Sequence, residues 1–401
     1  TMEEVFSAML AGNAVFFMDG YDKAMKISSR GYPGLDVSEA ETEKVLRGSK
    51  EGFCDRVKIN AALIRKRLRD TRLKVEQQDI GVRSHTVVQL LYVDDLVHEE
   101  LLESIKERLE FFTVDGILDS GMLEQLTEEA WYSPFPQFQT TERPDRAAQE
   151  LLNGKAVLLC DNSPVALVLP GAFNSFMESS EDWYNRFEMT SFLRVLRYLA
   201  MAVATLLPGL YLAVIRFHTQ VLPANLILSF AQAREGVPFS SVVELVFLEL
   251  SFELIREAGV RIPGELGNAI GIVGGLIIGQ AAVEANIVSP VVVIVIAFTA
   301  LCSFAIPNEE FAAAFRILKF FFIGMCAWLG FFGFLIALLA VFLHLASLKS
   351  FGIPYLMPFA GADLTNYQDE RDSLFRMPLF YLKKRPIFAS RRNKTRLRWK
   401  E

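Results

Sequence analysis

Residues 320–348 read FFFIGMCAWLGFFGFLIALLAVFLHLASL and contain no Asp, Glu, Lys or Arg. A helix needs about 20 apolar residues to cross the hydrocarbon core of a bilayer, which is about 30 Å thick. Three further runs also lack these four residue types, namely residues 198–215, 266–283 and 285–308. The chain is therefore predicted to be an integral membrane protein with four or more transmembrane helices.

A fifth charge-free run, residues 217–233, has a status that the sequence leaves open. Pro223 and Asn225 interrupt this run, and proline breaks the interior of a helix. The pattern fits a re-entrant or interfacial segment as well as it fits a fifth crossing.

The charged residues are unevenly distributed along the 401 residues. Residues 1–191 hold 21 of the 41 Lys and Arg and 33 of the 47 Asp and Glu, a net charge of 21 − 33 = −12, whereas the remainder nets 20 − 14 = +6. An acidic soluble half joined to a basic, hydrophobic half argues against nucleic acid as a partner and for membrane lipid around the second half. The four cysteines show no paired or metal-type spacing, which is typical of a reduced, cytosol-facing domain without disulfides.

The C-terminal segment KKRPIFASRRNKTRLRWKE, residues 383–401, carries nine Lys or Arg against one Glu. Positive segments next to a span stay on the cytoplasmic side, so the C-terminus is predicted to be cytoplasmic. An even number of crossings places the N-terminal half there too, and Arg194 and Arg197 just before the first span agree with this orientation. A tail that binds nucleic acid is the competing interpretation, and a juxtamembrane anchor is favoured over it.

Four regions are expected, in a fold that joins a mixed α/β soluble region of two small subdomains to a helical polytopic membrane domain. The soluble subdomains are residues 1–135 and 136–191. The transmembrane helical domain is residues 192–350, and the basic cytoplasmic tail is residues 351–401. The chain opens with TMEEVFSAMLAGNAVFFMDG as if inside a domain, so the first subdomain is expected to be truncated at its N-terminus.

Local patterns in the soluble half predict both strands and helices. The predicted strands are residues 14–18, 74–79 and 86–93, and the predicted helices are residues 60–69 and 99–111. Residues 151–170, LLNGKAVLLCDNSPVALVLP, add two apolar strands around Asp161, Asn162 and Ser163. These are turn residues, so the segment predicts a hairpin.

The soluble half carries no catalytic motif. His85 and His98 are isolated, no glycine-rich loop has phosphate-binding spacing, and no Ser, Cys or Asp lies in a nucleophile motif. Asp94 and Asp95 follow a predicted strand, and a solvated strand end is the favoured interpretation because this pair supplies too few oxygens for Ca²⁺. The sequence thus predicts no enzyme activity, no cofactor and no metal.

A stripe of glycines is the main feature of the membrane half. In GELGNAIGIVGGLIIGQAAVEAN, the glycines recur every four residues on one side of a helix, at Gly267, Gly271, Gly275 and Gly279. Tight packing against another helix is the favoured interpretation, and a pore lining is the alternative. Gln280 and Glu284 extend the stripe at its end, and an ionisable residue that borders a span is a functional candidate.

The preceding segment, FSSVVELVFLELSFELIREAG at residues 239–259, predicts an amphipathic helix. Its acidic face carries Glu249, Glu253, Arg256 and Glu257. An orientation in the plane of the membrane interface is favoured, with Glu253 and Arg256 paired at i, i+3 and the carboxylates facing water. The alternative is that this face lines a cation path in an oligomer.

Many ordered motifs resemble one family, the A subunits of GerA-type spore germinant receptors. They are DGYDKAM, EKVLRGSKEGF, NAALIRKRL, FPQFQTTERPD, the DNSP hairpin, SEDWYNRF, AREGVPF, ELIREAGVRIP, GNAIGIVGGLIIGQAAVEANIVSP and SFGIPYLMPFA, which cover nearly the whole chain. Two departures are that Trp183 replaces the usual second Tyr of SEDWYNRF, and that the usual N-terminal stretch is absent.

The resemblance implies a multi-pass protein of the spore inner membrane. Its implied partners are a transporter-like B subunit, which binds the nutrient, and a lipoprotein C subunit. The resemblance further implies self-association into a ring-shaped cation channel that opens when nutrient binds and triggers germination. Polar and small residues near Glu284 are what a cation-selective pore would require.

Two other classes stay open as alternatives. A secondary transporter would also use broken helices such as the one expected at Pro208–Gly209, although no internal repeat relates the predicted spans. A non-conducting membrane scaffold would use the glycine stripe for packing alone. The stage V sporulation AF-type protein is a related alternative, suggested by RGYPG at residues 30–34.

Overall fold

The chain forms two compact units, residues 1–195 with 345–401 and residues 196–344, called here the α/β unit and the helical unit. The computed structural model describes residues 14–21, 23–27, 39–40, 42–261, 278–360, 372–390 and 393–397, together with positions 2, 5, 6, 9 and 275. The α/β unit thus contains both ends of the chain.

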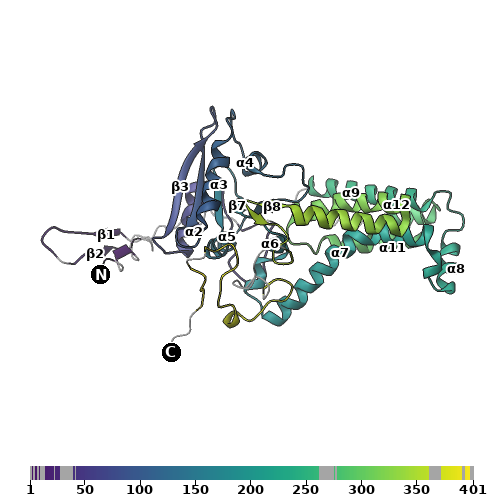
Figure 1. The fold of residues 1–401 in the computed structure, drawn as a ribbon. Helices are drawn as coiled ribbons and strands as arrows, with labels where there is room; N and C mark the ends of the chain where they lie inside the picture. Colours follow the sequence, from purple (N-terminus) through teal and green to yellow (C-terminus); the bar gives the residue numbers. More distant parts are fainter. Residues whose placement is uncertain are drawn as a thin grey trace. The chain divides into compact units, whose positions relative to one another are not determined.

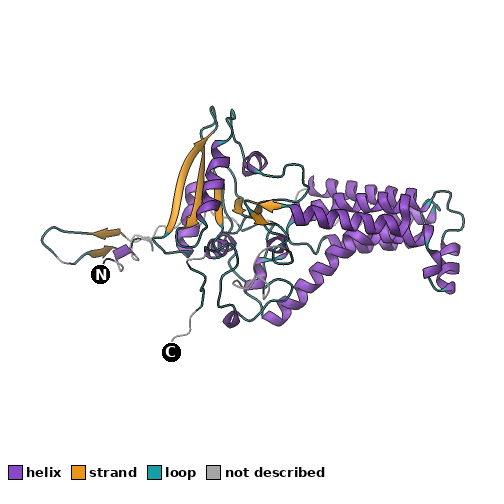
Figure 2. Ribbon diagram, viewed as in Figure 1, coloured by secondary structure: helices purple, strands orange, loops and turns teal. Residues whose placement is uncertain are grey.

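A five-stranded antiparallel sheet lies at the centre of the α/β unit (Figure 2). Its strands follow the order β3 (Leu73–Ile80), β4 (Thr86–Val93), β6 (Ala156–Cys160), β7 (Ala166–Leu169) and β5 (Gln139–Thr141). The β3–β4 hairpin pairs Leu73 with Val93, and β4 pairs with β6 so that Leu90 lies opposite Leu158. A separate two-stranded sheet joins β1 (Ala14–Phe16) to β2 (Met25–Ile27).

Helices cover both faces of the five-stranded sheet (Figure 1). They are α2 (Val57–Arg67), α3 (Glu99–Glu110), α4 (Ser120–Thr127) and α5 (Pro144–Leu152). Helices α2 and α5 pack in one hydrophobic cluster with Leu91 and Val157, whereas α3 and α4 pack in another with Leu90 and Leu158. Neighbouring strand residues point to opposite faces, so the apolar strands require a helical layer on each side.

Strands from both sides of residue 135 belong to this one sheet. The predicted strands at 74–79 and 86–93 and the predicted hairpin at 151–170 are confirmed, with small differences in their bounds. Because β4 pairs directly with β6, the predicted boundary between residues 1–135 and 136–191 does not divide the sheet. Two short helices, α6 (Phe173–Met177) and η1 (Ser180–Trp183), complete this part of the chain.

The chain re-enters the α/β unit after residue 344 and packs against it. The short strands β8 (Lys349–Ser350) and β9 (Ile353–Pro354) pair here. The Ser350 hydroxyl donates to the carbonyl of Gln137 at 3.0 Å, and the Tyr355 hydroxyl donates to that of Pro136 at 2.9 Å. These buried bonds fix the end of the last long helix to the segment before β5.

The described part of the basic segment at residues 351–401 docks on the α/β unit. The amide of Ser390 donates to the carbonyl of Leu96 at 2.6 Å, and the Asn393 side chain donates to Asp95 at 2.9 Å. Asp95 also pairs with Arg72 at 2.6 Å, so it is not the solvated strand end that the sequence favoured. The loop after β4 therefore binds the C-terminal segment, a contact that local charge patterns do not reveal.

The helices of the helical unit are α7 (Phe187–Phe217), η2 (Thr219–Val221), α8 (Ala224–Ala233), α9 (Ser241–Arg261), α11 (Pro290–Ser303) and α12 (Glu309–Ser347) (Figure 1). Residues of α7, α9, α11 and α12 share a hydrophobic cluster, whereas η2 and α8 contain no buried residue. A Cβ atom at Gly209 of α7 would lie 3.1 Å from Cys326 Sγ and 3.2 Å from the Phe322 carbonyl of α12. The two helices therefore approach each other closely where α7 has a glycine. Helix α12 is broken at Gly330, whose φ of 60° is left-handed.

Among the described helices, α7 and α12 are long and apolar enough to cross a membrane. Helix α11 has 14 residues and α8 has 10, about 21 and 15 Å in length, and both are shorter than the core of a bilayer. The predicted run 285–308 is not one continuous helix, because α11 begins only at Pro290, with Ser289 in extended backbone at the N-cap position. The run 266–283 lies mostly outside the described residues, so fewer described helices pass this length test than the four predicted.

Candidate functional site

The glycine stripe is described at two of its four positions. Gly267 and Gly271 lie outside the described residues. A Cβ atom at Gly279 would lie 3.4 Å from Val293 Cγ1 of α11, whereas no atom lies within 4 Å of a Cβ atom at Gly275. Gly279 therefore packs within the chain, and the described part of the chain leaves the surface at Gly275 uncovered.

The polar end of this helix is exposed. Gln280 Nε2 donates to Glu284 Oε1 at 2.9 Å, and both side chains are exposed. The structure thus brings together the two polar candidates that the sequence placed one turn apart.

The acidic face of α9 is partly buried, which corrects the predicted orientation toward water. Glu249 is 1% exposed and forms an ion pair with Lys319 of α12, which also lies 3.5 Å from Glu253. The predicted pair of Glu253 and Arg256 is confirmed at 3.8 Å. Glu257 is exposed. The reason for the burial is that α12 supplies a cation opposite Glu249.

Arg256 also contacts residues beyond α9. Its Nη2 donates to Ser303 Oγ at 2.8 Å, and its guanidinium lies 5.0 Å from the centre of the Phe304 ring. The acidic face of α9 therefore meets α12 through Lys319 and the end of α11 through Arg256.

A second buried ion pair in the helical unit was missed by sequence reasoning. The Glu244 side chain of α9 is fully buried, pairs with Arg234 at 2.9 Å and accepts the amide of Ser289 at 2.9 Å. For the first pair, Glu249–Lys319, the sequence held one signal. Lys319 lies directly before the charge-free run 320–348, and an ionisable residue among apolar ones needs a partner. Nothing local indicated which carboxylate that partner would be.

Both ion pairs fix how the helices pack. A charge buried without its partner costs several kcal/mol, so removing one member of a pair is strongly destabilising. Glu249 holds α9 to α12, and Glu244 holds α9 to the segment after α8 and to the start of α11. The arrangement therefore specifies neighbours within the helical unit, and the exposed Gln280–Glu284 pair lies outside it.

A different charge cluster lies in the α/β unit, around Arg194 in the first turns of α7. Arg194 is 1% exposed, and it lies 3.1 Å from Asp182, 2.9 Å from Asp372 and 3.6 Å from Glu178. The sequence indicated Arg194 only as a positive charge beside a span. In the structure it joins the segment before α7 to the C-terminal segment.

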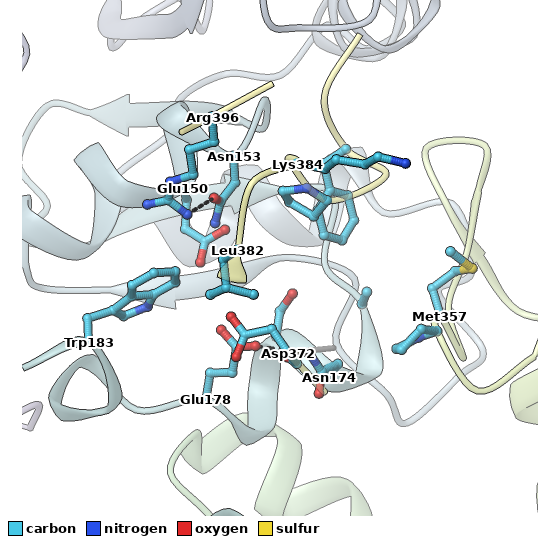
Figure 3. Close-up of a pocket in the computed structure, with 15 residues that line it drawn as sticks. Glu150, Asn153, Asn174, Glu178, Trp183, Met357, Asp372, Leu382, Lys384 and Arg396 are labelled. Atoms are coloured by element: carbon cyan, nitrogen blue, oxygen red, sulfur yellow. Dashed lines mark hydrogen bonds between the residues drawn. The ribbon is translucent and has the colours of Figure 1, made fainter. Parts of the chain in front are cut away.

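A cavity of about 60 Å³ lies beside this cluster (Figure 3). Glu178 and Asp372 point toward the same space, and Arg396 donates to Asn153 at 3.5 Å on another side of the cavity (Figure 3). This volume holds a few water molecules, whereas pockets for small-molecule ligands are about 300–1,000 Å³. The cavity is therefore too small for a nutrient molecule.

The carboxylates at Arg194 differ from ordinary exposed acids. Burial raises the pKa of Glu178 to about 7, although the Arg194 guanidinium opposes this rise and the Asp372 carboxylate adds to it. Burial likewise raises the pKa of Asp372. Glu178 is therefore a weaker acid than an exposed glutamate, because it shares the Arg194 cation with a second buried carboxylate.

Within the described residues, no group of three His, Cys, Asp or Glu has the geometry to hold a metal ion. Burial raises the pKa of the Cys160 thiol to about 12, so this thiol is not activated as a nucleophile.

The structure defines a protein with a three-layer α/β unit and an apolar helical unit, two of whose helices are long enough to cross a membrane. Residues 1–388 match the family described as Bacillus/Clostridium GerA spore germination protein. The chain belongs to this family, as the ordered motifs predicted.

Individual relatives agree with this assignment. Spore germination protein KA of Bacillus subtilis (strain 168) is 39% identical over 98% of this chain and 72% of its own length. Spore germination protein GerLA of Bacillus cereus is 40% identical over 98% of this chain and 80% of its own length. The crystal structure of the N-terminal domain of the A subunit of the Bacillus megaterium spore germinant receptor GerK3 is 28% identical. That match covers 43% of this chain and 60% of that one, with a TM-score of 0.33.

The Glu249–Lys319 pair makes a direct prediction about stability. Lys319→Met should leave the Glu249 carboxylate buried without its counter-charge and destabilise the folded chain by about 3–5 kcal/mol. Lys319→Met combined with Glu249→Met removes both charges and should recover most of that loss. Thermal unfolding of the purified full chain in detergent measures these differences.

Glu235→Gln, at an exposed position of the helical unit, serves as the control and should change stability by less than about 0.5 kcal/mol. A double variant that is less stable than Lys319→Met alone would show that the two charges are not coupled.

Proposed function

We propose that this protein is the A subunit of a nutrient-responsive spore germinant receptor, and that several copies form a cation channel in the spore inner membrane. Membership of the spore germination family supports the receptor assignment. The channel assignment rests on the helix that carries Gly275 and Gly279, called here the glycine helix. The Gln280–Glu284 pair is exposed at its end, and no described atom lies within 4 Å of a Cβ atom at Gly275.

In the proposed topology the helical unit crosses the membrane four or more times, and the α/β unit lies in the cytoplasm with the C-terminal segment. Helices α7 and α12 provide two crossings, and their length and hydropathy support this role. The glycine helix and the segment around α11 provide the others. The basic C-terminal segment supports a cytoplasmic location for both ends.

The proposed pore uses the glycine helix as its lining. A helix surface without side chains leaves room for hydrated ions when several copies surround an axis. The Glu284 carboxylate at its end raises the local concentration of cations. Helix α9 then serves as a support, because its carboxylates Glu244 and Glu249 are neutralised by Arg234 and Lys319.

The proposed partners are a transporter-like B subunit that binds the nutrient and a lipoprotein C subunit. The α/β unit is in a position to pass their signal on, because α7 and α12 continue into it. Arg194 anchors the start of α7, and Tyr355 anchors the chain shortly after α12. Both anchors belong to the α/β unit, and the chain continues from each of them into the helical unit.

Charge at the proposed pore mouth should control conductance. Glu284→Gln should lower the unitary current of the reconstituted full chain in a planar bilayer, and Glu284→Lys should lower it further. The effect should be greatest at low salt, where a surface charge is least screened. Asp115→Asn, an exposed carboxylate of the α/β unit, is the matched control and should leave the current unchanged.

Equal currents for all three residues at position 284 at low ionic strength would exclude Glu284 from the conduction path. The absence of any unitary conductance in membranes that contain the complete receptor would favour a transporter or a scaffold.

The two described glycines should respond differently to a large side chain. Gly279→Leu should clash with Val293 of the same chain and destabilise the protein by about 1–3 kcal/mol. Gly275→Leu has space within the chain, so the protein should fold and assemble, while the added side chains narrow the proposed pore and lower its unitary current. Native mass spectrometry of the detergent-purified complex measures assembly, and planar-bilayer recording measures the current. Failure of Gly275→Leu to assemble would show that Gly275 packs against a neighbouring helix and does not line the pore.

A further inference from the structure

An apolar patch is exposed on the C-terminal segment of the α/β unit. It consists of Phe375 (58% exposed), Met377 (40%), Leu379 (55%), Phe380 (49%) and Tyr381 (55%). The last three form the short helix η5 (Leu379–Tyr381), in which the rings of Phe380 and Tyr381 lie 4.6 Å apart. Five large side chains of seven consecutive residues are thus exposed to solvent at once, which marks an interaction surface.

This exposure does not result from an undocked tail. Asp372 before the patch pairs with the buried Arg194 at 2.9 Å. After the patch, Leu382, Phe388 and Ala389 are buried in the α/β unit. The chain is therefore held on both sides of the patch, while the apolar side chains between these points face outward.

The patch is attached to the first turns of α7. The amide of Arg376 donates to Ser191 Oγ at 3.0 Å, and the Ser191 hydroxyl lies 3.1 Å from the carbonyl of Arg376. Nearby residues of α7 are also apolar and exposed, namely Phe187, Met189 and Phe192. The C-terminal segment and the start of α7 are distant in sequence, yet both expose apolar side chains near the hydrogen bonds between Ser191 and Arg376.

The position of Ser191 along α7 sets the depth of the patch. The charge-free run of α7 begins at residue 198, seven residues later, which is about 10 Å along a helix. The headgroup layer on each side of a bilayer is about 5–8 Å thick. If α7 crosses the membrane, the hydrogen bonds to Ser191 lie about 2–5 Å outside the headgroup layer. Aromatic side chains of the patch are long enough to enter that layer.

The chemistry of the segment fits lipid better than a protein partner. Aromatic side chains are enriched at the interface between water and acyl chains. Lys383 and Lys384 follow the patch directly and are exposed, and basic residues beside apolar ones add attraction to anionic headgroups. We propose that residues 375–381 insert into the headgroup region of the membrane and anchor the α/β unit to the lipid surface. This proposal rests on the membrane-spanning role of α7 and α12.

Photocrosslinking in the full chain tests this contact. Phe380 is replaced by p-benzoylphenylalanine in membranes that contain a clickable phospholipid, and lipid adducts are measured after irradiation. Trp328 of α12, which is 77% exposed, is the positive control for a lipid-facing span, and Phe111 of the α/β unit, which is 85% exposed, is the control for water. The expected result is a lipid adduct at positions 380 and 328, at least fivefold above that at position 111.

Each other outcome overturns the proposal. A lipid adduct at 328 with only protein adducts at 380 would show that a protein covers the patch, and a lipid adduct at 328 with none of either kind at 380 would show that the patch stays in water. No lipid adduct at 328 would refute the membrane-spanning role of α12 on which the proposed function depends. In the expected case, Lys383→Glu combined with Lys384→Glu should lower the yield at 380 severalfold in anionic membranes at low salt.

Discussion

The organisation of the chain depends on the ion pairs that the buried guanidinium of Arg194 forms. An ionised side chain that is 1% exposed requires charged partners, because an unpaired buried charge costs several kcal/mol. Its partners come from residues before α7 and from the C-terminal segment, Asp182 at 3.1 Å and Asp372 at 2.9 Å. One side chain thus connects the exit of the chain from the α/β unit with its return.

The same physical requirement organises the helical unit. Apolar helices can slide or rotate against each other with small changes in contact energy, whereas a buried carboxylate must face its cation. Glu249 faces Lys319, and Glu244 faces Arg234 and the amide of Ser289. Among the described residues, no ion pair joins Glu284 to α9, and its side chain instead accepts a hydrogen bond from Gln280.

Local patterns in the sequence predicted those parts of the fold that depend on neighbouring residues. The strand at 86–93, the helix at 99–111 and the hairpin around Asn162 follow from alternation, helical spacing and turn chemistry. The absence of charge in residues 320–348 correctly indicated the long apolar helix α12. Residues 285–308 were predicted to form one span, but the absence of charge does not show that a new helix starts at Pro290.

Contacts between distant residues were not predictable from those patterns. Periodicity shows which side of α9 carries Glu249, but it does not show that Lys319 lies opposite. Charge counts likewise identified the C-terminal segment as basic, but they did not show that Asn393 bonds to Asp95 or that Asp372 pairs with Arg194. The candidate site was predictable only at Gln280 and Glu284, which are one turn apart on the same helix.

Hydrogen exchange of the full chain, with Arg194→Met compared to the wild-type residue, tests the central role of this side chain most directly. If Arg194 joins the segments, amides at residues 372–376 and 179–184 should exchange about tenfold faster or more in the variant, while those of β4 and β6 keep their protection. Arg186→Met, at an exposed arginine just before α7, should leave all of these rates unchanged. Unchanged exchange at residues 372–376 in Arg194→Met would contradict the account, because the C-terminal segment would then be held to the α/β unit without Arg194.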